Sequence, residues 1–295
     1  MKINIKDKKW KLSNCYLFLL IPGAFFFIIF LVFPLFWVVR VSFYENIPGG
    51  YMRAAWIFDN YKKFLGDFWY IQNVLFFSFK MAIGSSFFAI IFAYPIALYI
   101  VKSPGRMKKL LLTIVLSPLL ISLVCLSLGL IIIFRGGGLL NQFLQWVGII
   151  SVPLRFMYTS KLVFLGLIYV SIPYMVLNLL DNLSRIDPCL EEAAMNAGAN
   201  RWQCFFKIIL PLSTPGMYAG SLIILSINFC AFAIPQMIGP DRIPMIGLFV
   251  YHHAMENYNI PFATSTAIIT LLANLSILFV YQKVANNLFF KKLGV

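Results

Sequence analysis

The stretch Leu162-Val-Phe-Leu-Gly-Leu-Ile-Tyr-Val-Ser-Ile-Pro-Tyr-Met-Val-Leu-Asn-Leu-Leu180 runs for 19 residues without an Asp, Glu, Lys or Arg. A helix rises about 1.5 Å per residue, so this run is long enough to cross the roughly 30 Å hydrocarbon core of a bilayer. Comparable apolar intervals predict six membrane helices, at about 15–39, 79–101, 110–134, 161–183, 211–235 and 261–285. The sequence therefore predicts an all-α polytopic membrane protein.

The composition of the whole chain supports the same class. Of its 295 residues 61% are hydrophobic and only 12% are charged, which is more apolar surface than a water-soluble domain can bury. A soluble enzyme is therefore excluded. The five cysteines form no CxxC pair, so the sequence indicates neither a disulfide framework nor a metal site.

Basic residues predict the orientation of the six spans. With the N-terminus inside, 15 of the 24 Lys and Arg residues fall on the cytoplasmic side, which the positive-inside rule favours. Both termini are then cytoplasmic. Five lysines precede the first apolar run, which is too long for a signal-peptide core, so we expect an uncleaved first helix.

The chain is divided into three parts on this basis. Residues 1–72 comprise the cytoplasmic N-terminal tail, the first membrane helix and a long external loop, and residues 73–285 form the core membrane domain. A cytoplasmic loop at 184–211 interrupts that core, and residues 286–295 are a cytoplasmic tail.

Helix signals define the shape of the loop between the fourth and fifth spans. Asp187 can cap a helix that begins at Pro188, and Gly198 readily takes the left-handed conformation that ends one. Asn200 with Gln203 is a second N-terminal cap. The prediction is a short helix, a glycine corner and a second helix.

One face of the short helix has small apolar side chains at helical spacing, flanked by the charges of Glu191 and Glu192. These side chains are Leu190, Ala193, Ala194 and Ala197. Such a face can pack on its own bundle, or it can dock into a partner protein.

The spacing Glu192-Ala193-Ala194, three residues, Gly198, nine residues, Ile208, one residue, Leu210-Pro211 resembles the "EAA" signature of permease subunits of bacterial ABC importers. Further resemblance from about residue 60 to 285 is closest to the spermidine/putrescine, opine and aminoethylphosphonate branch. The segments that carry it are Leu139-Leu-Asn-Gln-Phe-Leu144, Pro153-Leu-Arg-Phe156, Gly166-Leu-Ile-Tyr169 with Pro173, Pro215-Gly216 with Gly220, and Pro235-Gln-Met-Ile-Gly239.

This resemblance implies a type I importer permease fold in a bacterial inner membrane, with the chain forming half of a translocation path for a polyamine or related amine-bearing solute. It implies three kinds of partner: an ATP-binding cassette ATPase dimer, a second and non-identical permease, and an extracytoplasmic solute-binding protein. The EAA loop would be the helix that couples to the ATPase, a role assigned to Glu192, Ala193, Ala194 and Gly198 together with Leu190 and Ala197 on the same helix. No cofactor is expected on this chain, because ATP and Mg²⁺ would bind to the ATPase.

Several other motifs were weighed against this function. Arg135-Gly-Gly-Gly138 lacks the Gly-Lys-Ser/Thr of a P-loop, so ATP hydrolysis on this chain is not expected. His252 and His253 with Glu256 indicate a surface loop and not a metal site, because adjacent histidines point to different helix faces.

Polar residues inside the spans are explained either by hydrogen bonds between helices or by a solute path. The candidates for a path are Ser171, Tyr174, Asn178, Ser221 and Asn228. The alternatives to a polyamine permease are an ion-coupled secondary transporter, or an ABC permease for a sugar, phosphonate, thiamine or iron. No intramembrane ionisable group or internal repeat favours the secondary transporter.

Overall fold

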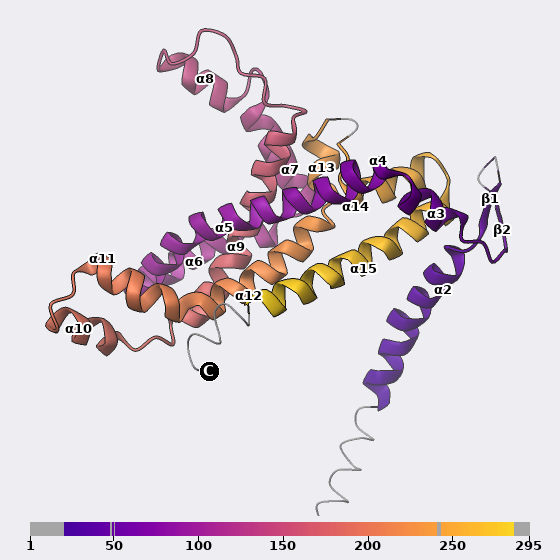
Figure 1. The fold of residues 1–295 in the computed structure, drawn as a ribbon. Helices are drawn as coiled ribbons and strands as arrows, with labels where there is room; N and C mark the ends of the chain where they lie inside the picture. Colours follow the sequence, from indigo (N-terminus) through magenta and orange to yellow (C-terminus); the bar gives the residue numbers. More distant parts are fainter. Residues whose placement is uncertain (1–20, 48, 50, 241–242, 286–295) are drawn as a thin grey trace, which may run out of the picture.

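The computed structural model describes residues 21–47, 49, 51–240 and 243–285 (Figure 1). The predicted tail at 286–295, and the first twenty residues with their lysines, lie outside the described residues. The helices of the described part are α2 (Phe33–Val41), α3 (Asp59–Gly66), α4 (Phe68–Tyr70), α5 (Phe77–Lys102), α6 (Gly105–Leu120), α7 (Leu123–Phe134), α8 (Leu139–Trp146), α9 (Ser160–Leu183), α10 (Pro188–Asn196), α11 (Arg201–Cys204), α12 (Leu210–Phe229), α13 (Ala233–Ile238), α14 (Ile246–Tyr251) and α15 (Ile260–Ala285).

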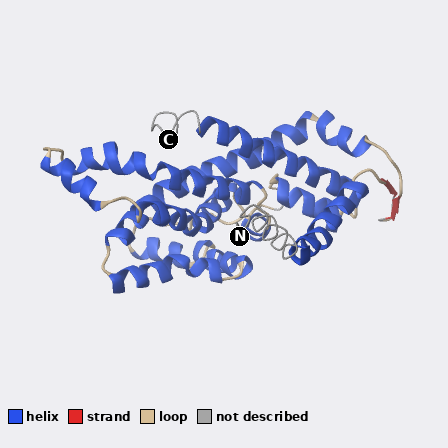
Figure 2. Ribbon diagram, turned by 90° about the horizontal axis from the view of Figure 1, so that it is seen from below, coloured by secondary structure: helices blue, strands red, loops and turns tan. Residues whose placement is uncertain are grey.

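Short π-helical turns extend several of these helices. They are η1 (Ile28–Val32), η2 (Ile71–Phe76), η3 (Phe205–Ile209) and η4 (His252–Glu256). The antiparallel hairpin of β1 (Glu45–Ile47) and β2 (Tyr51–Arg53) pairs Asn46 with Met52, and it is the one sheet in the described residues (Figure 2).

Six helical segments are long and apolar enough to cross a membrane, which confirms the predicted number among the described residues. They are Ile21–Val41, Phe68–Lys102, Leu123–Trp146, Ser160–Leu183, Arg201–Phe229 and Ile260–Val284. The second segment starts earlier than predicted, so the division between residues 72 and 73 falls inside a helix. That division stays a prediction.

The predicted third span, 110–134, is wrong as a single helix. α6 ends at Leu120, two residues after Pro118, and α7 begins at Leu123. Proline cannot donate a backbone hydrogen bond and weakens the turn before it, while the Ser122 side chain accepts from the Val124 amide 3.4 Å away and starts a new helix. The apolar segment that begins at α7 continues beyond 134 through a glycine turn into α8.

The fifth span also differs at both ends from the prediction of 211–235. The helix is continuous from α11 through η3 into α12, and the π-helical turn η3 lies directly before Pro211, which has no backbone amide to donate. α12 ends at Phe229, and α13 is a separate short helix.

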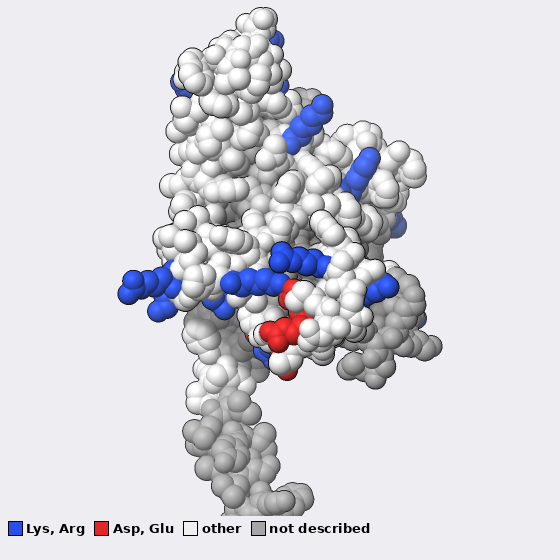
Figure 3. All heavy atoms as spheres, turned by 90° about the vertical axis from the view of Figure 1, so that its left-hand side faces the viewer, with Lys and Arg blue, Asp and Glu red and all other residues white. Residues whose placement is uncertain are grey.

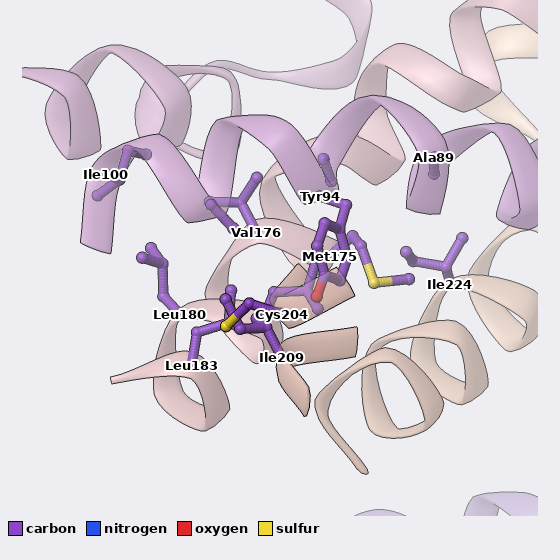
Figure 4. Packing of buried hydrophobic residues seen from close by; sticks show 13 residues of the cluster. Ala89, Tyr94, Ile100, Met175, Val176, Leu180, Leu183, Cys204, Ile209 and Ile224 are labelled. Carbon is purple, nitrogen blue, oxygen red and sulfur yellow. The ribbon is translucent and has the colours of Figure 1, made fainter. Parts of the chain in front are cut away.

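The core lies between α5, α9 and α12, which pack side by side (Figure 1). Glycines on α12 allow close approach: a Cβ at Gly216 would lie 2.7 Å from the Cβ of Asn182 on α9. At the α10 end of the bundle Tyr94, Met175, Leu179 and Ile209 are buried together (Figure 4). The first span, by contrast, extends away from the bundle, with only 6% of its apolar window buried.

Candidate functional site

The short helix α10 forms where the capping signals predict it. The Asp187 Oδ1 accepts a hydrogen bond from the Cys189 amide at 2.9 Å, and Pro188 occupies the first helical position. This bond from a backbone amide stabilises the charged carboxylate and lowers the pKa of Asp187 below its ordinary value. The start of α10 is therefore fixed by residues within the loop.

Gly198 ends α10 in a left-handed turn, with φ +90°. The Gly198 amide donates to the Met195 carbonyl and the Ala199 amide donates to the Ala194 carbonyl, each at 3.0 Å. This pair of bonds is the Schellman arrangement, which requires a positive φ at the glycine position. The predicted glycine corner is confirmed.

The chain then re-enters a helix through a reciprocal cap. The Asn200 Oδ1 accepts from the Gln203 amide at 2.8 Å, and the Gln203 Oε1 accepts from the Asn200 amide at 3.0 Å. The helix that follows runs without interruption into α12. The glycine corner therefore joins α10 to one continuous helix of the core.

The structure divides the predicted apolar face of α10 into two parts. Ala194 is half-buried and packs against the core cluster of α5, α9 and α12. Leu190 keeps 46% of its surface exposed, and Ala193 and Ala197 are exposed as well. Glu192 is also exposed. One side of α10 therefore packs on its own bundle, and the other side is exposed, as docking into a partner protein would require.

A contact that the sequence analysis missed links α10 to α5. Lys102 Nζ lies 2.8 Å from both Glu191 Oε1 and Glu191 Oε2. Lys102 is one of the 15 basic residues that the predicted orientation places in the cytoplasm, and Glu191 was predicted only as a charge beside the apolar face. No local pattern connects two residues that are 89 positions apart.

The candidate path residues do not form one group. Ser171 and Asn228 meet in the buried core, where Asn228 Nδ2 donates to Ser171 Oγ at 2.8 Å and to Ser85 Oγ at 2.7 Å. Ser221 instead contacts the Tyr281 hydroxyl on α15, with 2.7 Å between the two oxygens. Asn178 donates to the Tyr174 carbonyl one turn earlier, at 2.9 Å.

The contacts of Ser171, Ser221 and Asn228 connect helices, whereas that of Asn178 lies within α9. A role for these residues in a solute path stays a prediction. Ser171 and Asn228 are only 2% and 1% exposed in this single chain. Ser85, which completes the group, was missed because it lies beside Ser86 in a largely apolar span and no spacing distinguishes it.

The two histidines lie at the end of the molecule opposite α10. His252 Nδ1 is 2.7 Å from Glu256 Oε1, whereas the His253 ring lies between the rings of Phe249 and Phe262, at centroid distances of 4.4 and 4.9 Å. Burial, and then the positive charge of Lys63, lowers the pKa of His253. Among residues that the structure describes, no three His, Cys, Asp or Glu side chains gather as a metal site.

Comparisons with known proteins show what this chain is similar to. No family model matches the chain. The spermidine/putrescine transport system permease protein PotB of Salmonella typhimurium (strain SL1344) is 29% identical over 268 residues, covering 90% of this chain and 92% of that protein. PotB of Escherichia coli (strain K12) is likewise 29% identical, over 265 residues and 95% of its length.

Solved structures share the fold. A chain of a bacterial ABC transporter that imports the acidic polysaccharide alginate superposes with a TM-score of 0.72 at 20% identity, covering 97% of this chain and 99% of that one. A chain of the MetNI methionine ABC transporter gives 0.56 at 18% identity, covering 74% and 96%. With six apolar helices, relatives that match along most of its length and this shared architecture, the chain resembles permease subunits of ABC importers in both sequence and fold.

Proposed function

We propose that this permease forms one half of the translocation path for a polyamine or a related amine-bearing solute, in the inner membrane of a bacterium. The observation that carries the coupling part of the proposal is the α10 helix, whose ends are fixed by a cap and a glycine corner while Leu190, Ala193 and Ala197 stay exposed. The amine class is supported by the names of the relatives, which transport spermidine and putrescine.

The exposed face of α10 is the proposed seat for an ATPase subunit. Its small side chains allow a partner surface to approach closely, and Glu192 at its edge offers a charge for pairing. Gly198 holds the angle between α10 and the helix leading into α12, so a push on α10 is transmitted to the core. ATP and Mg²⁺ bind to the ATPase dimer in this proposal, and this chain holds no cofactor.

Two further partners complete the proposed importer. A second, non-identical permease supplies the other half of the path, and an extracytoplasmic binding protein delivers the solute. The first span supports a larger assembly, because a helix that is 6% buried in its own chain has most of its surface free for other helices or lipid. The five path residues remain proposed contacts within that assembly.

The decisive experiment reconstitutes the chain with a second permease, an ATPase and a binding protein of the same organism, and follows ¹⁴C-labelled spermidine uptake into proteoliposomes. We expect uptake that needs ATP and the binding protein, and none when the second permease is omitted. Robust uptake without that permease would overturn the heterodimer. Uptake of a sugar, phosphonate, thiamine or iron complex in place of spermidine would overturn the amine class.

The coupling face is tested with a single charge. Ala193→Glu places a carboxylate in the proposed close contact, so we expect the ATPase to be lost on purification while the permease stays in the membrane. The matched control is Ser184→Glu, which adds the same charge at an exposed position outside α10. Normal ATPase binding by Ala193→Glu would show that this face is not the seat.

A further inference from the structure

The ion pair between Lys102 and Glu191 joins two elements that the chain does not otherwise connect directly. Lys102 is the last residue of α5, and Glu191 lies in the first turn of α10. The ammonium nitrogen is 2.8 Å from both carboxylate oxygens, and the Glu191 side chain is only 30% exposed. Among the described residues this is the only side-chain hydrogen bond between α10 and a membrane-spanning helix.

A cavity lies beside this contact. It has a volume of about 360 Å³ and is lined by both members of the pair, by Val101 of α5, by Leu190 of α10 and by Ile208 of η3. Because the space between them is not filled by side chains, packing alone does not fix this side of α10 to the end of α5. Figure 3 views this end of the molecule, where acidic side chains gather among spread-out basic ones.

The polypeptide chain does not join α5 directly to α10, so motion of α10 does not reach α5 along the chain. α10 is joined by the chain to α9 on one side and to α12 on the other. α5 is one of the three core helices, but it meets α10 through non-covalent contacts and not along the chain. A displacement of α10 that moved α9 and α12 without α5 would shear the buried contacts among these helices.

We propose that Lys102 and Glu191 are a positioning pair that fixes α10 to the end of α5, so that the second span moves with α9 and α12 when α10 is displaced. The proposal rests on the proposed function of α10 as the seat of the ATPase. The pair acts through the position of α10 and contacts neither solute nor nucleotide. A partly exposed ion pair changes an equilibrium constant by up to about fivefold. A change of this size in the position of α10 is enough to alter the fraction of ATP hydrolysis cycles that move a solute.

The test is a charge swap in the assembled importer, with spermidine uptake and ATP hydrolysis measured together. Lys102→Glu and Glu191→Lys each set like charges against one another, and each is expected to lower solute moved per ATP hydrolysed by about fivefold. The double variant restores opposite charges, so we expect the ratio to return to within about twofold of the original. Loss of membrane insertion or of helix stability alone would not be repaired by such a swap.

A second ion pair of the chain is the matched control. Arg185 and Asp181 are 3.0 Å apart at the end of α9, both more than two-thirds exposed, and only four residues apart in sequence. This pair does not join two separate elements. Reversing one or both of its charges should therefore leave the amount of solute moved per ATP hydrolysed unchanged. Equal sensitivity of the two pairs would overturn the proposed role, as would normal coupling in both single reversals of Lys102 and Glu191.

Two outcomes separate this inference from the function on which it rests. If the original assembly shows no solute-stimulated hydrolysis, the proposed function fails. If that assembly is coupled but the double reversal is as defective as the single ones, only the positioning role fails. A bifunctional maleimide joining Lys102→Cys to Glu191→Cys, in a chain whose native cysteines are replaced by serine, tests the proximity itself without any transport assay. We expect efficient cross-linking, and its absence would overturn the contact.

Discussion

At the scale of single residues, Gly198 is a position where the backbone conformation disfavours any side chain. Its φ of +90° is unfavourable for any residue with a Cβ, although no neighbouring atom lies within 4 Å of the place where a Cβ would be. The cost of Gly198→Val is therefore backbone strain, about 1–2 kcal/mol, with no steric clash. We expect the corner to open and hydrolysis to uncouple from uptake.

Gly105 supplies the control for this substitution. It is the first residue of α6 on the same end of the molecule, has equally open surroundings and has no positive φ. Gly105→Val should leave uptake and hydrolysis coupled. If Gly198→Val is also coupled normally, the fixed corner is not needed to transmit motion.

His253 allows a test of electrostatics at the opposite end. Its lowered pKa means that the unfolded chain takes up a proton before the folded chain does, so stability falls as the pH drops below the ordinary value of about 6.5. Because burial is the main cause and Lys63 the second, Lys63→Met should raise the pKa only part of the way. The measurement is the pH dependence of diethylpyrocarbonate modification of His253.

Lys62→Met is the control for that experiment. Lys62 is adjacent and carries the same charge, but it is exposed and lies near Asp59. It should not change the titration of His253. An equal effect of both lysine substitutions would mean that net charge, and not the position of Lys63, sets the shift.

At the scale of elements, the packing of α9 against α12 depends on Gly216, beside which there is no space for a side chain. A Cβ at Gly216 would lie 2.7 Å from the Cβ of Asn182 and 2.9 Å from the carbonyl oxygen of Asn178, which cannot move without moving the backbone of α9. Gly216→Ala should cost about 1–3 kcal/mol. The measurement is the thermal unfolding of the purified assembly.

Alanine substitutions at two other glycines serve as comparisons for the cost of Gly216→Ala. The nearest atom to a Cβ at Gly220 would be the sulfur of Met175, a flexible side chain, so Gly220→Ala should cost less. Gly129 on α7 has nothing within 4 Å, so Gly129→Ala should be neutral. A cost for Gly216→Ala no larger than that for Gly129→Ala would contradict the close approach of α9 and α12.

The buried group around Asn228 joins three elements of the core. Because Asn228 Nδ2 donates to a serine on α5 and to one on α9, Asn228→Ala removes two bonds between helices and should destabilise the assembly by about 1 kcal/mol. Ser276→Ala is the control, since that hydroxyl bonds only to its own helix. Reduced uptake with unchanged stability would instead favour a direct place for Asn228 in the solute path.

At the scale of the whole molecule, orientation in the membrane is the prediction with the widest consequences. Both termini are expected inside, with α10 in the cytoplasm and the 236–260 region outside. Cys189 on α10 is exposed and provides a native reporter. We expect a membrane-impermeant maleimide added to intact cells to label a cysteine at 257 but not Cys189, and labelling of both from one side would exclude this topology. The Asp187 carboxylate, through a hydrogen bond with the Cys189 side chain and through its charge, raises the pKa of Cys189 and slows its labelling, so permeabilised cells are the control.

The sequence by itself determined the parts of this protein that depend on neighbouring residues. Apolar runs set the six spans because the bilayer requires about 20 apolar residues in a row, and Asp187, Gly198, Asn200 and Gln203 set the loop because caps act within a few positions. Only the tertiary structure decided that Ala194 packs inward while Ala193 stays exposed, and that Lys102 meets Glu191. These features depend on which helices lie side by side, and contacts between residues far apart in the chain leave no periodic trace in the sequence. The ends of the spans were shifted for the same reason, since apolar composition marks where a helix can cross the membrane and not where its last hydrogen bond forms.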